Sequence, residues 1–130
     1  MKSNGGGTPL HCASFEGYTE VVNLLIEKGA DIHVKDNDGD TPLHDASMYG
    51  CTEVVNLLIE KGADINVKDN TGPTPLHHAS WSHCTEVVNL LIEKGADIHV
   101  KDNDGDTPLH SASYKGHTEV VNLQIGRAHV

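Results

Sequence analysis

The sequence predicts an all-α fold, a stack of four copies of one unit that contains two short helices. Two motifs carry this prediction, because TPLH and TEVVNL each occur four times at intervals of 33 residues. A third motif, KDN, occurs three times at the same interval. A fixed period without insertions indicates one supersecondary unit repeated within a single domain. The predicted repeats span about residues 1–33, 34–66, 67–99 and 100–123.

The segment TPLHDASMYG predicts the first helix of a unit, a helix of only a few turns. Thr41 is a good N-cap residue, and Pro42 stands in the first turn, where a helix tolerates proline. Gly50 stands where a left-handed residue is needed to end the helix. We therefore expect a helix between Pro42 and Gly50, and equivalent helices in the other units.

The segment TEVVNLLIEKG predicts the second helix of the unit. We expect Thr52 to cap it, Glu53 to lie at its positive end and Lys61 at its negative end. Gly62 is expected to terminate the helix, and ADINVKDNTG then supplies the residues of a turn. The apolar residues of this helix are Val54, Val55, Leu57, Leu58 and Ile59. They cover more than one stripe, so the helix must be buried against its partner helix and against a neighbouring unit.

The period, the TPLHxA motif and the run GxTEVVNLLIxxGADI resemble the ankyrin repeat, from about Lys2 to Leu123. The resemblance implies a curved ankyrin-repeat solenoid of four stacked helix-turn-helix units that are joined by β-hairpin-like turns. It also implies that the histidines of the TPLH motifs tie backbone between units. These histidines are His11, His44, His77 and His110. Members of this family bind other proteins through the hairpin tips and the concave face formed by the first helices.

The last copy departs from the repeat at Gln124, where QIGRAHV replaces LIEKGAD. One interpretation is a C-terminal capping repeat, in which polar residues replace outer apolar ones. A more specific hypothesis is that residues 124–130 are a non-native tail, translated from the common sequencing adapter AGATCGGAAGAGCACACGTCTGA. One frame of this adapter encodes Ile-Gly-Arg-Ala-His-Val followed by a stop, and a preceding CAG codon encodes Gln. We therefore expect the natural chain to continue, and Met1 to begin a fragment.

The chain carries 19 acidic and 9 basic residues, which gives a net charge of −10 with neutral histidines. Phosphate groups repel such a chain, so we expect no nucleic acid and no membrane as partner, and favour a protein with a neutral or basic surface. No signal peptide and no membrane-spanning apolar run is visible. The three cysteines lack a CxxC motif, which favours free thiols and a cytoplasmic or other intracellular location. We also expect a monomer.

Motifs for catalysis are absent, because the chain contains no GxSxG, P-loop or GxGxxG sequence. We predict that it is not an enzyme and that it uses no cofactor. The densest group of possible metal ligands is His77, His78, His83 and Cys84. Its spacing matches neither of the usual zinc patterns, and the ankyrin resemblance already assigns His77 to structure, so we expect no metal site.

Two adjacent positions on the first helix vary strongly between copies and hold four of the five aromatic residues outside His. The residue before TPLH also varies. Because the framework positions are nearly constant, we predict that the variable positions face a partner. The predicted partner-binding residues are Phe15, Glu16, Met48, Tyr49, Trp81, Ser82, Tyr114, Lys115, Asp40 and Asp106. The alternative is that one aromatic edge per unit packs on its neighbour.

Three functions remain open from the sequence. The first is a non-catalytic module for protein–protein interaction that uses the concave helix face and the hairpin tips. The second is an interior scaffold segment of a longer solenoid. The third is a regulatory fragment of a larger enzyme or membrane protein. Because ankyrin repeats serve many functions, the fold by itself does not identify the partner.

Overall fold

The computed structural model describes residues 6–128, with side chains as far as Ile125, and contains eight helices and no strand in that range. The helices are α1 (Pro9–Glu16), α2 (Thr19–Glu27), α3 (Pro42–Met48), α4 (Thr52–Glu60), α5 (Pro75–Trp81), α6 (Thr85–Glu93), α7 (Pro108–Lys115) and α8 (Thr118–Ala128). The predicted all-helical class is confirmed. Residues 1–5 of the first predicted repeat and residues 129–130 of the predicted tail lie outside the described residues.

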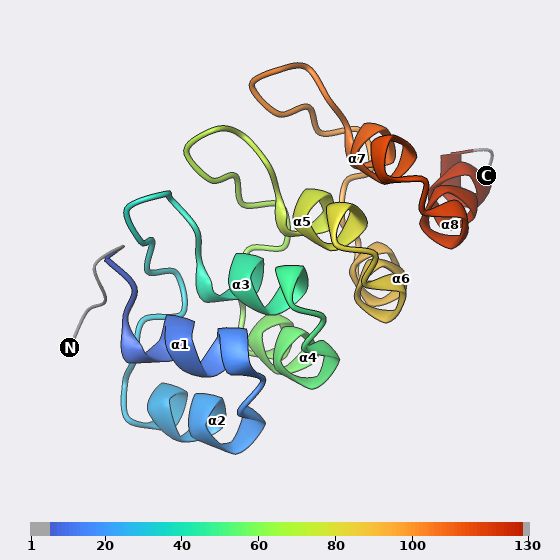
Figure 1. Cartoon of the computed structure of the whole chain (residues 1–130). Helices are drawn as coiled ribbons and strands as arrows, with labels where there is room; N and C mark the ends of the chain where they lie inside the picture. The colour runs from blue at the N-terminus through green and yellow to red at the C-terminus, as the bar shows by residue number, and fades with distance from the viewer. Residues whose placement is uncertain (1–5, 129–130) are drawn as a thin grey trace.

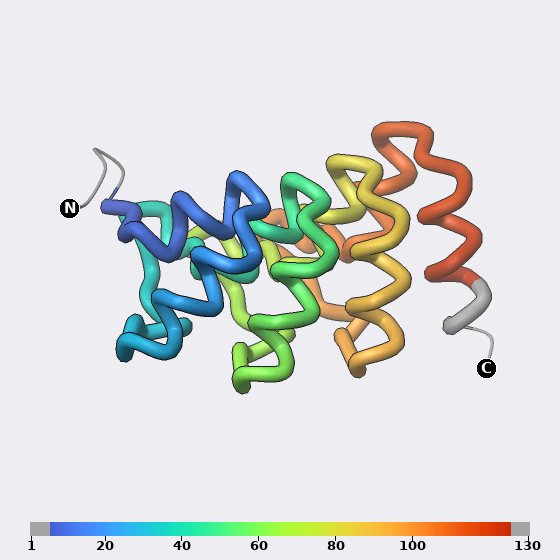
Figure 2. The backbone as a smooth tube through the Cα atoms, turned by 90° about the horizontal axis from the view of Figure 1, so that it is seen from below, coloured from blue at the N-terminus to red at the C-terminus, as the bar shows by residue number. Residues whose placement is uncertain are grey.

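The helices form two parallel rows (Figure 1). The first row contains α1, α3, α5 and α7, and the second row contains α2, α4, α6 and α8; each helix packs on its neighbours within its row and on its sequence partner across the rows. The loops that follow α2, α4 and α6 project to the same side, next to the first row (Figure 1). The view of the second row in Figure 2 shows an extended stack, with α2 near one end and α8 at the other.

The helices of the first row begin as the sequence predicts. Thr41 is the N-cap of α3 and accepts a hydrogen bond from the backbone N–H of His44, at 3.4 Å. In the reciprocal hydrogen bond, Nδ1 of the His44 ring accepts from the backbone N–H of Thr41 at 3.0 Å. Pro42 follows at the first helical position, and Gly50 is left-handed with φ 70°. Both ends of this helix are therefore set by residues within or beside it.

One predicted cap of the second-row helices is wrong. Thr52 is the first helical residue of α4, and Cys51 occupies the N-cap position without a side-chain capping bond. The tight turn at Gly50 explains the difference. The N–H of Cys51 donates to the carbonyl of Ala46, and the N–H of Thr52 donates to that of Gly50, each at 2.9 Å. Backbone groups thus lead the chain into the helix, and no side-chain cap is used.

The core lies between the two rows. Val54, Val55 and Leu58 of α4 are fully buried, and Leu57 and Ile59 pack partly buried against the same core. This confirms that α4 is covered on more than one side. At the α1–α2 end of the stack the equivalent face is open, since the equivalents of Val54 and Leu57 in α2 are exposed. Burial in this fold therefore depends on having a neighbour in the stack.

Three of the four TPLH histidines link neighbouring units, as the resemblance implies; the hydrogen bonds described for the fourth, His110, go to Thr107 of its own unit. Because Nδ1 of His11 accepts from the N–H of Thr8, the proton of the neutral ring lies on Nε2. That Nε2 donates to the backbone carbonyl of Asp40, 29 residues further on, at 2.8 Å. The other two links join His44 to the carbonyl of Pro73 at 3.1 Å and His77 to that of Asp106 at 2.8 Å. Burial lowers the pKa of His44 to about 4, which keeps this link in its neutral form.

The projecting loops are short turns closed by backbone hydrogen bonds. In the loop before α3, the N–H of Asp36 donates to the carbonyl of Asp40, and Gly39 at φ 80° makes the turn. Neighbouring loops are joined in turn, since the N–H of Asn70 donates to the carbonyl of Asp38 at 2.9 Å. No helix in the described part of the chain is both long enough and apolar enough to cross a membrane.

Candidate functional site

The four aromatic side chains of the variable positions are open to solvent, as predicted. The exposed fractions are 40% for Phe15, 54% for Tyr49, 48% for Trp81 and 69% for Tyr114. Phe15 and Tyr49, from neighbouring units, meet edge to face with ring centroids 4.3 Å apart. Part of this aromatic set therefore packs on its neighbour, as the alternative interpretation held, yet each ring keeps a large exposed area.

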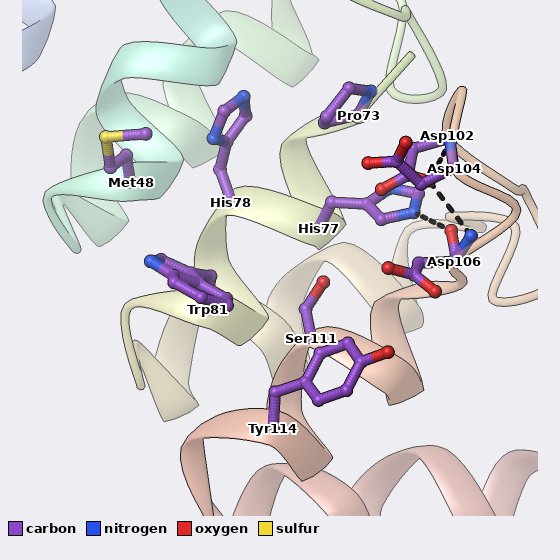
Figure 3. Close-up of a pocket in the computed structure, with 10 residues that line it drawn as sticks. All are labelled: Met48, Pro73, His77, His78, Trp81, Asp102, Asp104, Asp106, Ser111 and Tyr114. Atoms are coloured by element: carbon purple, nitrogen blue, oxygen red, sulfur yellow. Dashed lines mark hydrogen bonds between the residues drawn. The ribbon is translucent and has the colours of Figure 1, made fainter. Parts of the chain in front are cut away.

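Trp81 and Tyr114 lie in a groove between the first row of helices and the projecting loop before α7 (Figure 3). The groove encloses about 480 Å³. Its lining residues are Met48, Pro73, His77, His78, Trp81, Asp102, Asp104, Asp106, Ser111 and Tyr114. The helices contribute an apolar and aromatic wall, while the loop contributes three carboxylates on the opposite side (Figure 3). We call this hollow the aromatic–acidic groove.

The acidic wall of the groove is held in place by its own backbone. One carboxylate oxygen of Asp102 accepts from the N–H groups of Asp104 and Asp106, each at 2.9 Å. The backbone carbonyl of Asp106 is occupied by His77. Lining residues of the groove include no Lys or Arg. Beside the aromatic wall, Nζ of Lys115 lies 4.7 Å from the centre of the Trp81 ring and makes a cation–π contact.

The same groove recurs 66 residues earlier in the chain. A second hollow of about 290 Å³ is lined by Gly7, His11, Cys12, Phe15, Glu16, Asp36 and Asp45. His11, Phe15 and Asp36 stand here where His77, Trp81 and Asp102 stand in the larger groove. Burial, together with the nearby carboxylates of Asp40 and Asp36, raises the pKa of Asp45 to about 7. The two hollows therefore use equivalent positions of the repeat.

The predicted partner-binding residues are only partly brought together. Met48, Trp81, Tyr114 and Asp106 line the larger groove, and Phe15 and Glu16 line the smaller one. Tyr49 and Lys115 contact aromatic neighbours of these grooves, and Ser82 is exposed beyond the end of α5. Asp40 does not line either groove, because its carboxylate lies next to His78 and His44. Partner binding by this set remains a prediction.

Sequence reasoning missed several lining residues. Asp45 and the motif histidines were not among the predicted site residues. The available signal was the repeat itself, because the aspartates of the three KDN motifs recur every 33 residues, the same interval as the variable positions. The group His77, His78, His83 and Cys84 does not converge. His77 bonds to Asp106, while the His83 ring stacks on His117 at 4.3 Å.

Comparisons with known proteins agree with this architecture. The family model "Ankyrin repeats (3 copies)" matches residues 1–69, 28–102 and 66–127. Among curated proteins, the chain is similar to protein phosphatase 1 regulatory subunit 12A from mouse, human and rat. In each case the identity is 53% over 34 residues, which is 26% of this chain and 3% of the relative. The similarity to these relatives thus extends over about one repeat, whereas the family model matches nearly the whole chain. The protein belongs to the ankyrin repeat family.

Proposed function

We propose that this chain is a non-catalytic protein-interaction module whose four stacked repeats, joined by hairpin-like turns, bind a basic segment of a partner protein. The observation that carries the proposal is the aromatic–acidic groove. It combines exposed aromatic rings with three loop carboxylates in one hollow. The family supports the class of function, because ankyrin repeats generally mediate contacts between proteins.

The aromatic wall supplies the expected anchor. Large aromatic side chains dominate the energy of protein interfaces when a partner desolvates them. Trp81 is 48% exposed and Tyr114 is 69% exposed; they stand on adjacent units, with Met48 beside them in the groove. A lone exposed aromatic residue is common, but rings gathered in one hollow form a patch that favours binding. Trp81 and Tyr114 are therefore the proposed contact residues.

The acidic wall supports a partner with Lys or Arg side chains. Asp102 and Asp106 face the rings across the groove, and the chain as a whole carries a net charge of −10. A cationic side chain could then meet carboxylates on one side and an aromatic face on the other. A cation–π contact of this kind already exists within the chain, because Nζ of Lys115 lies 4.7 Å from the centre of the Trp81 ring. The proposed partner surface is basic, the compartment intracellular and the chain monomeric.

Two alternatives use the same fold. A scaffold segment would need the stack but not the groove, and so does not explain the exposed rings. A regulatory part of a larger enzyme is favoured by the similarity to a phosphatase regulatory subunit. That similarity covers 34 residues, about the length of one repeat, so it supports the repeat fold more strongly than a shared role. We therefore place the interaction module first.

The test uses the only tryptophan of the chain, Trp81, as the probe. Short random peptides are selected by display on the intact chain, and their binding is measured by the change in Trp81 fluorescence and by calorimetry. We expect the selected peptides to be rich in Lys and Arg. The Trp81→Ala variant should lose about 30-fold or more in calorimetric affinity, which corresponds to about 2 kcal/mol.

The matched control is Tyr18→Ala. Tyr18 is also aromatic and 56% exposed, but it lines neither groove. Its substitution should leave peptide affinity unchanged. Selection of peptides without basic residues, or equal affinity of the chain and its folded Trp81→Ala variant, would contradict the proposal.

A further inference from the structure

Three side chains from two consecutive loops and α5 converge beside the aromatic–acidic groove. Asp40 ends the loop before α3, Asp69 lies in the loop before α5, and His78 lies on α5. Nε2 of His78 is 3.0 Å from Oδ2 of Asp69 and 3.5 Å from Oδ1 of Asp40. These ligand atoms lie within 4.8 Å of one another. We call these three residues the Asp–Asp–His cluster.

Each member of the cluster is oriented by contacts outside it. Oδ1 of Asp69 accepts from the N–H and the hydroxyl of Thr71, at 3.0 and 3.2 Å, so Oδ2 remains for the cluster. The backbone of Asp40 is bound at both its N–H and its carbonyl. Its Oδ1 is buried and has no hydrogen-bond partner. The site is therefore preorganised and contains an unsatisfied oxygen.

A fourth residue, His44, lies next to the cluster but cannot serve as a ligand. Nδ1 of His44 accepts from Thr41, and its Nε2 donates to the carbonyl of Pro73. Its ring instead meets the ring of His78 edge to face, with centroids 5.3 Å apart. His44 thus supports the orientation of His78, and the candidate ligands number three.

The spacing of these atoms fits a transition-metal ion. Zinc binds imidazole nitrogen and carboxylate oxygen at about 2.0–2.2 Å, so two ligands of a tetrahedral ion lie about 3.3–3.6 Å apart. Of the two distances around Nε2 of His78, 3.5 Å lies within that range and 3.0 Å lies slightly below it. Two carboxylates and a neutral imidazole balance the charge of a divalent ion and leave a coordination position for water. We propose that Asp40, Asp69 and His78 bind a divalent transition-metal ion such as Zn²⁺.

The cluster is also accessible. The side chains of His78 and Asp40 are 14% and 16% exposed, and His78 lines the aromatic–acidic groove, where Figure 3 shows it next to Met48. An ion can enter from solvent along this route. Because Asp40 and Asp69 belong to consecutive loops and His78 to α5, the bound ion would join three segments at the edge of the groove.

The repeat provides an internal comparison. Asp40, Asp69 and His78 correspond to Gly7, Asp36 and Asp45 one unit earlier. One unit later they correspond to Pro73, Asp102 and Ser111. Within the described residues, the combination of two carboxylates and an imidazole at these positions therefore occurs once. The ankyrin framework does not require it, since the neighbouring units fold without it.

The test measures Zn²⁺ binding to the intact, metal-stripped chain by competition with a chromophoric chelator. We expect one ion per chain. His78→Ser introduces the residue that the last unit carries at this position, and should weaken binding at least about 10–100-fold, the loss that even an outer-shell change causes. Asp69→Asn should weaken it similarly. The matched control, His99→Ser, removes an exposed loop histidine and should leave the affinity unchanged.

A second measurement guards against a variant that merely unfolds. Zn²⁺ should raise the melting temperature of the original chain and of His99→Ser but not that of His78→Ser, whose own metal-free melting curve shows whether it folds. Co²⁺ should give the visible absorption of a tetrahedral site only when His78 is present. All three cysteines remain in these variants, so thiols cannot account for a difference. Equal Zn²⁺ affinity of the original chain and folded His78→Ser would overturn the proposal.

Discussion

Gln124 should destabilise the fold in a measurable way. It stands 33 and 66 residues after Leu91 and Leu58, which are fully buried, and it is itself only 1% exposed. Its Nε2 donates to the hydroxyl of Ser80 at 2.9 Å, but its Oε1 is buried without a partner. A polar side chain thus occupies a leucine position with half of its amide unsatisfied. We predict that Gln124→Leu stabilises the protein.

The magnitude follows from three contributions. Relief of a buried unsatisfied acceptor is worth about 1–3 kcal/mol, and loss of the bond to Ser80 costs about 0.5–1.5 kcal/mol. Burial of the larger apolar surface of leucine adds about 1 kcal/mol, part of the ~1.5–3 kcal/mol for a whole side chain. The net gain in the free energy of unfolding is about 1–2 kcal/mol. For a chain of this size the melting temperature should rise by about 4–8 °C.

The assay is urea unfolding followed by circular dichroism, with Ser80→Ala as the second arm of a double-mutant cycle. Ser80→Ala should destabilise the original chain, because it removes the one partner of the Gln124 amide, and should be nearly neutral in the chain that already carries Gln124→Leu. The coupling energy should be about 1 kcal/mol. An unchanged or lower stability of Gln124→Leu would refute the reasoning, since the amide would then be satisfied in the fold.

Three further predictions concern other parts of the stack. His83 is the one described non-glycine residue with positive φ, at 60°, so His83→Gly should stabilise the chain by about 1 kcal/mol in urea unfolding, and a loss of stability would contradict this. The pKa of Asp45 is raised to about 7, mainly by burial, so the charged form disfavours folding. The free energy of unfolding, and with it the melting temperature, should therefore decrease between about pH 4 and pH 7. Asp45→Asn should remove this decrease, whereas Asp104→Asn, at an exposed position, should not. If the pH profile of Asp45→Asn is unchanged, the raised pKa of Asp45 is not its cause. The cysteines are free in the structure, so thiol titration of the unfolded chain without reductant should find three reactive groups, and fewer would indicate a disulfide.

Residues at the two ends of each first-row helix determine where that helix begins and ends. A Thr N-cap, a Pro at the first helical position and a left-handed residue at the far end act within a few residues, so they can be recognised without knowing the rest of the fold. The same reasoning placed a cap at Thr52 and was wrong there. There, backbone hydrogen bonds of the preceding turn lead the chain into α4. The N-cap residue of α4, Cys51, makes no side-chain capping bond.

By itself, the sequence determined the period, the helices and the apolar positions of the core, because each depends on spacing along one unit. The tertiary structure decided which side chains meet across units. It placed Asp102 opposite Trp81, directed the carboxylate of Asp40 toward His78, and buried Gln124 against Ser80. Such contacts join residues that lie 21 to 44 positions apart. Their geometry depends on the angle and offset at which successive units stack, and no local preference of the chain specifies these.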